Sequence, residues 1–131
     1  MILYPDTVAH VITRLDDLLK ARTEPYTDNV TVTDDAIDGR CVTVSRAGGF
    51  TGNTFMTANH AVDVYAPDSG DASDLALMVV ALYLEHGPQG VCDGNPVTHA
   101  TLNSGPSIIQ STTEQTRYRM VFPTTVRGTT I

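Results

Sequence analysis

The residue types that carry out most protein chemistry are sparse in this sequence and lack a familiar catalytic spacing. The nearest approach to a nucleophile and its base is Cys92 with His99, which stand seven positions apart, but no nucleophile motif surrounds Cys92. Buried cysteines are far commoner than catalytic ones. We therefore expect Cys41 and Cys92 to be reduced thiols that pack as small hydrophobic side chains.

Metal and phosphate sites are not indicated either. The four histidines are not spaced like metal ligands, and each is expected to lie at the surface or to bond a neighbour. Residues 34–39 (DDAIDG) resemble the start of an EF-hand loop, but its last ligand position holds Ser45 instead of a bidentate Glu. Residues 48–53 (GGFTGN) lack the Lys-Ser/Thr of a phosphate-binding loop. The sequence thus predicts no catalytic residues, no metal and no cofactor.

Composition indicates a folded acidic protein. The 131 residues suit one domain, residues 1–131, and 41% hydrophobic with 18% charged residues is typical of a globular chain. Eight Lys and Arg against fifteen Asp and Glu give a net charge of -7, whereas sequence-blind nucleic-acid binders normally present a basic face. The longest apolar run, residues 75–84, is too short to span a bilayer, and the first residues lack the basic segment of a signal peptide. We therefore expect a soluble intracellular protein or an assembly subunit.

Charge is distributed unevenly along the chain. No Lys or Arg occurs between Arg46 and Arg117, although seven acidic residues do. After Glu114 the chain contains Arg117, Arg119 and Arg127 and no acid. An acidic middle and a basic end suit head-to-tail contact between identical subunits, or contact with a differently charged partner. Ordinary solvated surface is the alternative interpretation.

Two helices are predicted from apolar spacing. Over residues 6–21, apolar side chains recur at intervals of three and four, and Asp6 is placed to cap the first turn. The second helix covers residues 71–86, where Ser69 or Asp71 can act as the cap. The His-Gly-Pro sequence that follows is a stop signal.

The second helix is apolar nearly all round. Leu75 and Val79 lie on one side, and Leu77, Val80 and Leu84 lie on another. A helix with this pattern must be covered on more than one side. One side can pack on a sheet, and the other needs the first helix or a second subunit.

Strands are predicted where polar and apolar residues alternate with a period of two. They cover residues 29–33, 40–46, 58–66, 97–103 and 115–126. Residues 47–49 should end the second strand and residues 50–57 should form a loop. Pro123 should bend the last strand or place it at a sheet edge. The order of elements predicts an α+β fold, with a mixed or antiparallel sheet of about five strands and two helices packed on one face.

Several phrases, in order, resemble the tail terminator proteins of long-tailed (siphovirus-type) bacteriophages, especially those of actinobacteria. An amphipathic N-terminal helix comes first. The phrases that follow it are residues 40–49 (RCVTVSRAGG), 61–66 (AVDVYA), 74–76 (DLA), 117–121 (RYRMV) and 126–128 (VRG). Together they span nearly the whole chain.

The resemblance implies a structural virion protein and no enzyme. Members of the family form a six-membered ring that caps the head-proximal end of the tail tube, stops tube polymerisation and offers a docking face to the head. The partners it implies are further copies of the chain, the major tail tube protein and the head-completion or connector protein. DNA would pass through the lumen without specific binding, and no membrane is involved. The ring would be assembled in the cytoplasm of the bacterial host and would sit at the head-tail junction of the virion.

The predicted site residues are therefore interface residues. Arg46, Phe50 and Phe55 lie in or beside the predicted loop, and an exposed Phe there would anchor a partner, whereas folding back into the core is the alternative. The three C-terminal arginines would meet acids of a neighbouring subunit. The residues in this second set are Arg117, Arg119 and Arg127 on one side, with Asp68, Asp71 and Asp74 on the other.

Other functions remain as alternatives. A head-closure or neck protein of the same virion would also be a small α+β ring subunit. A monomeric ligand-binding domain would contain a dominant apolar pocket. A small enzyme would use Cys92 and His99.

Overall fold

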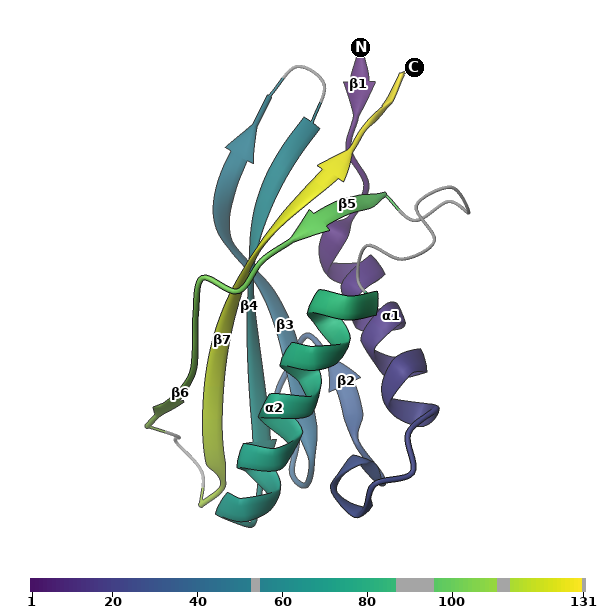
Figure 1. The fold of residues 1–131 in the computed structure, drawn as a ribbon. Helices are drawn as coiled ribbons and strands as arrows, with labels where there is room; N and C mark the ends of the chain where they lie inside the picture. Colours follow the sequence, from purple (N-terminus) through teal and green to yellow (C-terminus); the bar gives the residue numbers. More distant parts are fainter. Residues whose placement is uncertain (53–54, 87–95, 111–113, 131) are drawn as a thin grey trace.

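Two helices pack on one face of a twisted sheet, which confirms the predicted α+β fold (Figure 1). The computed structural model describes residues 1–52, 55–86, 96–110 and 114–130. Its helices are α1 (Thr7–Lys20), the 3-10 turn η1 (Pro25–Thr27) and α2 (Ser69–His86). Its strands are β1 (Ile2–Leu3), β2 (Thr31–Thr33), β3 (Cys41–Thr51), β4 (Phe55–Ala66), β5 (Val97–Ala100), β6 (Ser104–Ile109), β7 (Thr116–Arg127) and β8 (Thr129–Thr130).

The main sheet contains six strands, one more than predicted. The order is β2-β3-β4-β7-β5, and β6 also pairs with β7. All pairs are antiparallel except β2 with β3, so the sheet is mixed. A separate antiparallel pair, β1 with β8, brings the two ends of the chain together (Figure 1).

Helix α1 forms as its sequence predicted. The Asp6 carboxylate accepts a hydrogen bond from the Ala9 amide at 3.1 Å, which satisfies one of the unpaired amides of the first turn. Val11, Leu15 and Leu19 are spaced by four and are buried against the sheet. The amphipathic pattern therefore fixes which side of α1 faces the core.

Helix α2 begins two residues earlier than predicted, and its cap is a different residue. The Asp68 carboxylate accepts from the Gly70 amide at 3.4 Å, and the Asp68 carbonyl accepts from the Ala72 amide at 3.0 Å. The predicted caps, Ser69 and Asp71, are both inside the helix. Any of the three polar residues suits a cap, so the sequence alone could not choose among them.

Alternation along the central strands places one row of side chains under the helices. On β3 and β4 these are Val42, Val44, Val62 and Val64, and β7 adds residues such as Phe122. Their paired positions, for example Val44 with Val62, confirm the predicted period of two. The result is a core between the sheet and both helices.

The predicted loop at residues 50–57 is wrong. Strand β3 continues through Gly48 and Gly49 to Thr51, and β4 already begins at Phe55. The two glycines have positive φ values of 95° and 139°, and they absorb a bulge in the pairing between Arg46 and Gly49. The glycines therefore bend the strand and do not end it.

These extended strands form a hairpin that continues past both helices, and we call residues 45–52 and 55–59 the arm (Figure 1). A second, smaller core supports the arm. It contains Met56, Ala58, Val97 and Val126, with Tyr4 packed against them. The Tyr4 hydroxyl also donates to the Gly52 carbonyl at 2.8 Å, so the N-terminal segment holds the arm in place.

Pro123 lies in a central strand, contrary to the prediction of a bend or an edge. It is paired with Asn59 of β4, and its carbonyl accepts from the Thr101 amide at 3.1 Å on the other side of β7. The amide and carbonyl of a strand residue point to the same neighbour. The side of Pro123 that lacks an amide hydrogen therefore faces residues 101–103. These residues lie between β5 and β6, where the pairing with β7 passes from one strand to the other.

Strands β5 and β6 differ from the prediction of one strand over residues 97–103. Strand β5 ends at Ala100, and β6 was missed. The sequence of β6, SGPSII, lacks a polar-apolar alternation, so no pattern indicated a strand there. Neither described helix combines the length and the apolar composition needed to cross a bilayer.

Candidate assembly surfaces

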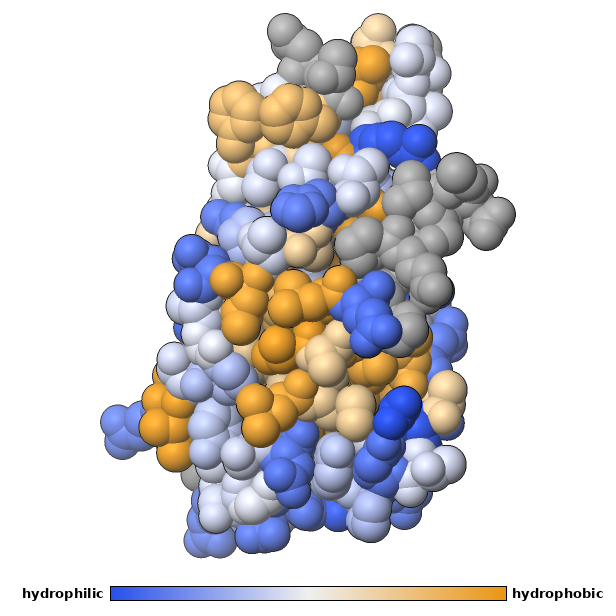
Figure 2. All heavy atoms as spheres, in the orientation of Figure 1, coloured by the Kyte–Doolittle hydropathy of each residue, from blue (hydrophilic) through white to orange (hydrophobic). Residues whose placement is uncertain are grey.

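Helix α2 presents an apolar stripe to solvent. Leu77, Val80, Ala81 and Leu84, which we call the α2 stripe, follow one another at the spacing of one helical face. Leu77 is 57% exposed and Leu84 is 37% exposed. Figure 2 shows apolar side chains gathered over this helix.

The position of α2 over the sheet explains why this stripe is open. Its opposite side buries Leu75, Val79 and Leu82 in the core, which confirms that one side of the helix lies on the sheet. Helix α2 packs over β4 and β7, whereas α1 packs over β2 and β3. The first helix therefore leaves Leu77 and Leu84 exposed. Of the two coverings that the sequence left open for this side, the first helix and a second subunit, the first helix does not cover these two residues.

Acidic side chains flank the α2 stripe. Asp74 is exposed one turn before Leu77, and Glu85 is exposed next to Leu84. The helix contains no Lys or Arg. Its outer side is therefore an apolar strip with negative charge at both ends.

The arm carries a second exposed apolar group. Phe50 is 62% exposed and Phe55 is 45% exposed, with their ring centroids 6.3 Å apart. This observation decides between the two predictions for these residues, because neither folds back into the core. Arg127 is paired with Phe55 in the sheet, and Arg46 is exposed at the base of the arm.

Arg117 and Arg119 have a partner within the chain that sequence reasoning missed. Arg117 donates to the Asp63 carboxylate at 2.5 Å, and Arg119 donates to it at 2.8 Å. The Arg117 guanidinium also lies 5.3 Å from the centre of the Tyr65 ring. The hydrogen bond that Arg119 donates to Asp63 is the main cause that raises the pKa of Arg119.

The spacing of these residues in the sequence gives part of the information needed to predict this cluster. Asp63 and Tyr65 occupy alternate positions of β4, and Arg117 and Arg119 occupy alternate positions of β7. Antiparallel pairing sets Asp63 directly opposite Arg119 on the helix-free face. The contact follows from the register, which the sequence alone did not supply.

Asp71 is likewise paired within the chain. Its carboxylate accepts from Arg40 at 2.7 Å, and Arg40 also donates to the carbonyls of Pro25 and Asp28 at 3.0 Å and 2.9 Å. The pairing ties the start of α2 to η1. Among the predicted interface residues, Asp74 thus lies beside the α2 stripe, whereas Asp71 is part of an internal bridge.

A buried polar network connects four elements of the fold. His60 Nδ1 lies 2.9 Å from the Tyr83 hydroxyl and 3.2 Å from Thr124 Oγ1, and His60 Nε2 lies 2.9 Å from Thr7 Oγ1. The Thr124 hydroxyl also donates to the Phe122 carbonyl at 3.1 Å. The network links α1, β4, α2 and β7, and its side chains are buried. No substrate can reach it, so we assign it to stability.

The environment of His60 favours the neutral ring. Burial, followed by the positive charge of Arg46 and by His10, lowers the pKa of His60 to about 4. Burial likewise raises the pKa of the Tyr83 hydroxyl. Both side chains are therefore uncharged members of the network at neutral pH.

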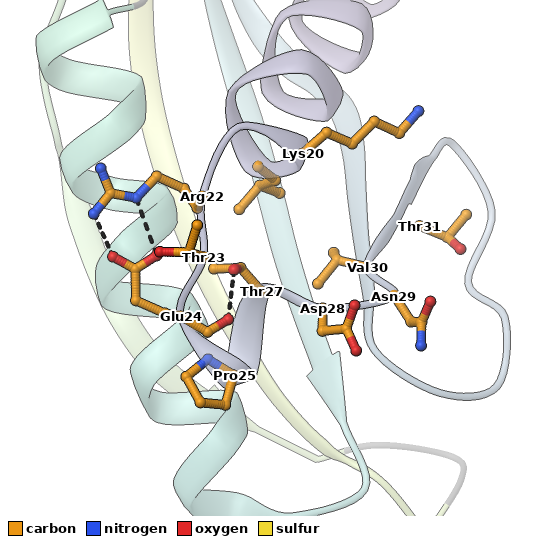
Figure 3. A pocket seen from close by; sticks show the side chains of 11 residues that line it. Lys20, Arg22, Thr23, Glu24, Pro25, Thr27, Asp28, Asn29, Val30 and Thr31 are labelled. Atoms are coloured by element: carbon orange, nitrogen blue, oxygen red, sulfur yellow. Dashed lines mark hydrogen bonds and ion pairs between the residues drawn. The ribbon is translucent and has the colours of Figure 1, made fainter.

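A groove with a volume of about 710 Å³ lies between the end of α1 and β2 (Figure 3). Polar groups dominate its lining, including the Arg22–Glu24 ion pair and Thr27, whose hydroxyl donates to the Glu24 carbonyl at 2.7 Å. It is unlike the dominant apolar pocket that the ligand-binding alternative requires. It gives that alternative no support.

The enzyme alternative relies on Cys92 and His99, of which the structure describes only His99. Cys92 lies outside the described residues, and His99 is exposed on β5. Cys41 is buried on β3, and burial raises the pKa of its thiol, as expected for a packing residue. Within the described ranges, no group of three His, Cys, Asp or Glu side chains is close enough to hold a metal ion.

Comparison with known proteins gives similarity to solved structures and none to known sequences. No protein-family model and no curated protein sequence matches the chain. A solved structure described as "Virion of native gene transfer agent (GTA) particle" contains a chain with 16% identity and a TM-score of 0.49, over 95% of this chain and 100% of that chain. A similarity of this size is one of general outline and does not assign a role.

Proposed function

We propose that this chain is a structural protein of a phage-type virion, and specifically a tail terminator. Copies of the chain form a ring on the head-proximal end of the tail tube, which ends polymerisation of the tube and presents a face to the head. The virion origin of the similar solved structure agrees with this proposal, which does not depend on it.

The observation that carries the proposal is the presence of two unlike exposed apolar surfaces in one small chain. One is the α2 stripe, and the other is the Phe50–Phe55 group on the arm. Contact between two unlike surfaces of identical subunits is heterologous, and such contacts close into rings when the rotation permits. The order of phrases shared with tail terminator proteins supports the same role.

The charge of the chain is compatible with a DNA channel. A net charge of -7 disfavours tight binding of phosphate groups, so DNA could slide through the ring without being held. The partners in this role are the major tail tube protein on one face and the head-completion or connector protein on the other.

Electron microscopy with sedimentation tests the proposal. Purified protein, alone and mixed with isolated tail tubes of the same virion, should give rings or ring-capped tubes in negative stain. Sedimentation velocity should give a mass of several subunits, and we expect six. A single subunit mass at every concentration, with bare tube ends, would contradict the proposal.

The head-closure protein of the same virion is the alternative. It predicts binding to DNA-filled heads that lack tails and none to isolated tubes. The measurement with isolated tail tubes therefore distinguishes the tail terminator role from the head-closure role.

A further inference from the structure

We infer that the arm of one subunit docks on the α2 stripe of the next subunit. This inference rests on the proposed ring and specifies its contact. The partner at each surface is thus a second copy of this chain, which presents a different surface in return.

The apolar groups of the two surfaces match in kind. Phe50 and Phe55 form a compact aromatic pair, and aromatic side chains are the residues that most often anchor protein interfaces. The α2 stripe offers aliphatic side chains along two turns, with Leu77 as its most exposed member. Within one subunit these groups do not cover each other, because both stay exposed.

The charges of the two surfaces are complementary. The arm bears Arg46, and residues 45–62 contain no acid. Helix α2 bears Asp74 and Glu85 at the ends of its stripe and contains no Lys or Arg. Two arms would therefore repel each other, as would two α2 stripes, whereas an arm and an α2 stripe attract. This charge pattern favours the unlike pairing that a ring requires.

The backbone of the arm suits this task. Tyr4 and the small core around Met56 and Val126 hold one side of the arm, which leaves the Phe pair displayed on a supported hairpin. A supported surface loses less conformational freedom on binding than a flexible loop.

Cross-linking between two single-cysteine variants tests the contact directly. We would prepare Phe50→Cys and Leu77→Cys, each in a Cys92→Ser background, and oxidise them separately and as an equimolar mixture, with and without tail tubes. Cys41 is buried and remains in place. A disulfide forms only where the two Cα atoms come within about 7 Å.

The inference predicts a covalent dimer in the mixture and none in either variant alone. The matched control is Phe50→Cys mixed with Ile37→Cys, because Ile37 is 46% exposed and lies outside both surfaces. This control should give no dimer. A dimer from Phe50→Cys alone would show arm-to-arm contact and would overturn the inference, and equal yields with both partners would also overturn it.

Self-association of substituted chains gives a second test. Phe50→Ser and Leu77→Ser should each weaken ring formation by about thirtyfold or more, whereas Ile37→Ser should not change it. Arg46→Glu and Asp74→Arg should each weaken it, and the two together should restore it in part. Thermal unfolding of each variant checks that the fold is retained.

The outcomes separate this inference from the proposed function. Rings formed by the mixture of cysteine variants without a cross-link, or wild-type rings with no effect of the substitutions, overturn the inference and leave the tail terminator role standing. Failure of the wild type to form rings or to cap tubes removes both.

Discussion

The arm continues two strands of the body, β3 and β4, but the two regions differ in what covers them. In the body, β3, β4 and β7 lie under two helices, and the core cluster there contains fourteen buried residues. In the arm, β3 and β4 continue past the helices, and the cluster that supports the arm contains four buried residues, of which only Met56 and Ala58 belong to the arm. The body therefore holds most of the folding free energy, and the arm is free to display apolar side chains to a partner.

This contrast separates two uses of the same residue type. Phe122 is buried and stacks on Tyr83 with ring centroids 4.0 Å apart, whereas Phe50 faces solvent. One sheet can contain both a stable core and a binding surface when helices bury one of its ends and leave apolar side chains exposed at the other. The experiments below test how far the two regions are independent.

Removal of an aromatic ring should lower the free energy of unfolding by very different amounts in the two regions. Phe122→Ala leaves a cavity under both helices and should lower the free energy of unfolding by about 3–5 kcal/mol. Phe50→Ala removes a ring that is mostly hydrated already, and should change that free energy by about 0.5 kcal/mol or less. Urea unfolding of monomeric samples measures both, and equal losses would mean that the division into body and arm is wrong.

Acid should weaken the body through His60. Its pKa is about 4 in the folded protein and near the ordinary value of 6.5 when unfolded, so the unfolded state binds the proton more readily. The stabilising effect of the neutral ring is complete above pH 6.5 and is lost as the pH falls towards 4. The loss amounts to about 3 kcal/mol.

Urea unfolding at a series of pH values measures this loss. His60→Gln keeps polar groups in the network but does not titrate, so its stability should change less between pH 6.5 and pH 4 than that of the wild type. An identical slope in both proteins would show that other groups cause the acid sensitivity.

Replacement of glycine by alanine in the arm tests whether the arm can open while the body stays folded. Gly49 has a φ of 139°, and a Cβ there would collide with the Thr57 carbonyl oxygen, so Gly49→Ala should cost about 1–3 kcal/mol. Gly48 has a φ of 95° and nothing within 4 Å, so Gly48→Ala should cost less. Amide hydrogen exchange should show faster opening of the arm, with protection of the body unchanged. Uniform loss of protection would show that arm and body unfold together.

Two ion pairs on the body should differ in strength. Asp63 is nearly buried and bonds two arginines, so Asp63→Asn should lower stability by about 1–2 kcal/mol. The Arg40–Asp71 pair is more exposed, and Asp71→Asn should cost less than about 1 kcal/mol. Thermal unfolding at low and high salt compares them. A larger loss at Asp71 would reverse the ranking that burial predicts.

Local patterns predicted the body well and the arm poorly. The three-and-four spacing of Val11, Leu15 and Leu19 and the alternation of Val42 with Val44 reflect burial on one side, so they identified α1 and β3. In the arm, residues 45–51 of β3 are exposed, and the glycines that usually end a strand here accommodate a bulge. Strand residues that are exposed on both faces need not alternate between polar and apolar types. The sequence pattern therefore predicted a loop over residues 50–57.

The candidate surfaces divide in the same way. The sequence by itself determined that α2 is too apolar for one covered side and that its charges are all negative, because both follow from residue types along one helix. Only the tertiary structure decided that Leu77 and Leu84 stay exposed, since α1 packs on other strands. It also decided that Arg119 bonds Asp63, because residues so far apart in sequence meet through strand register, which depends on the whole sheet.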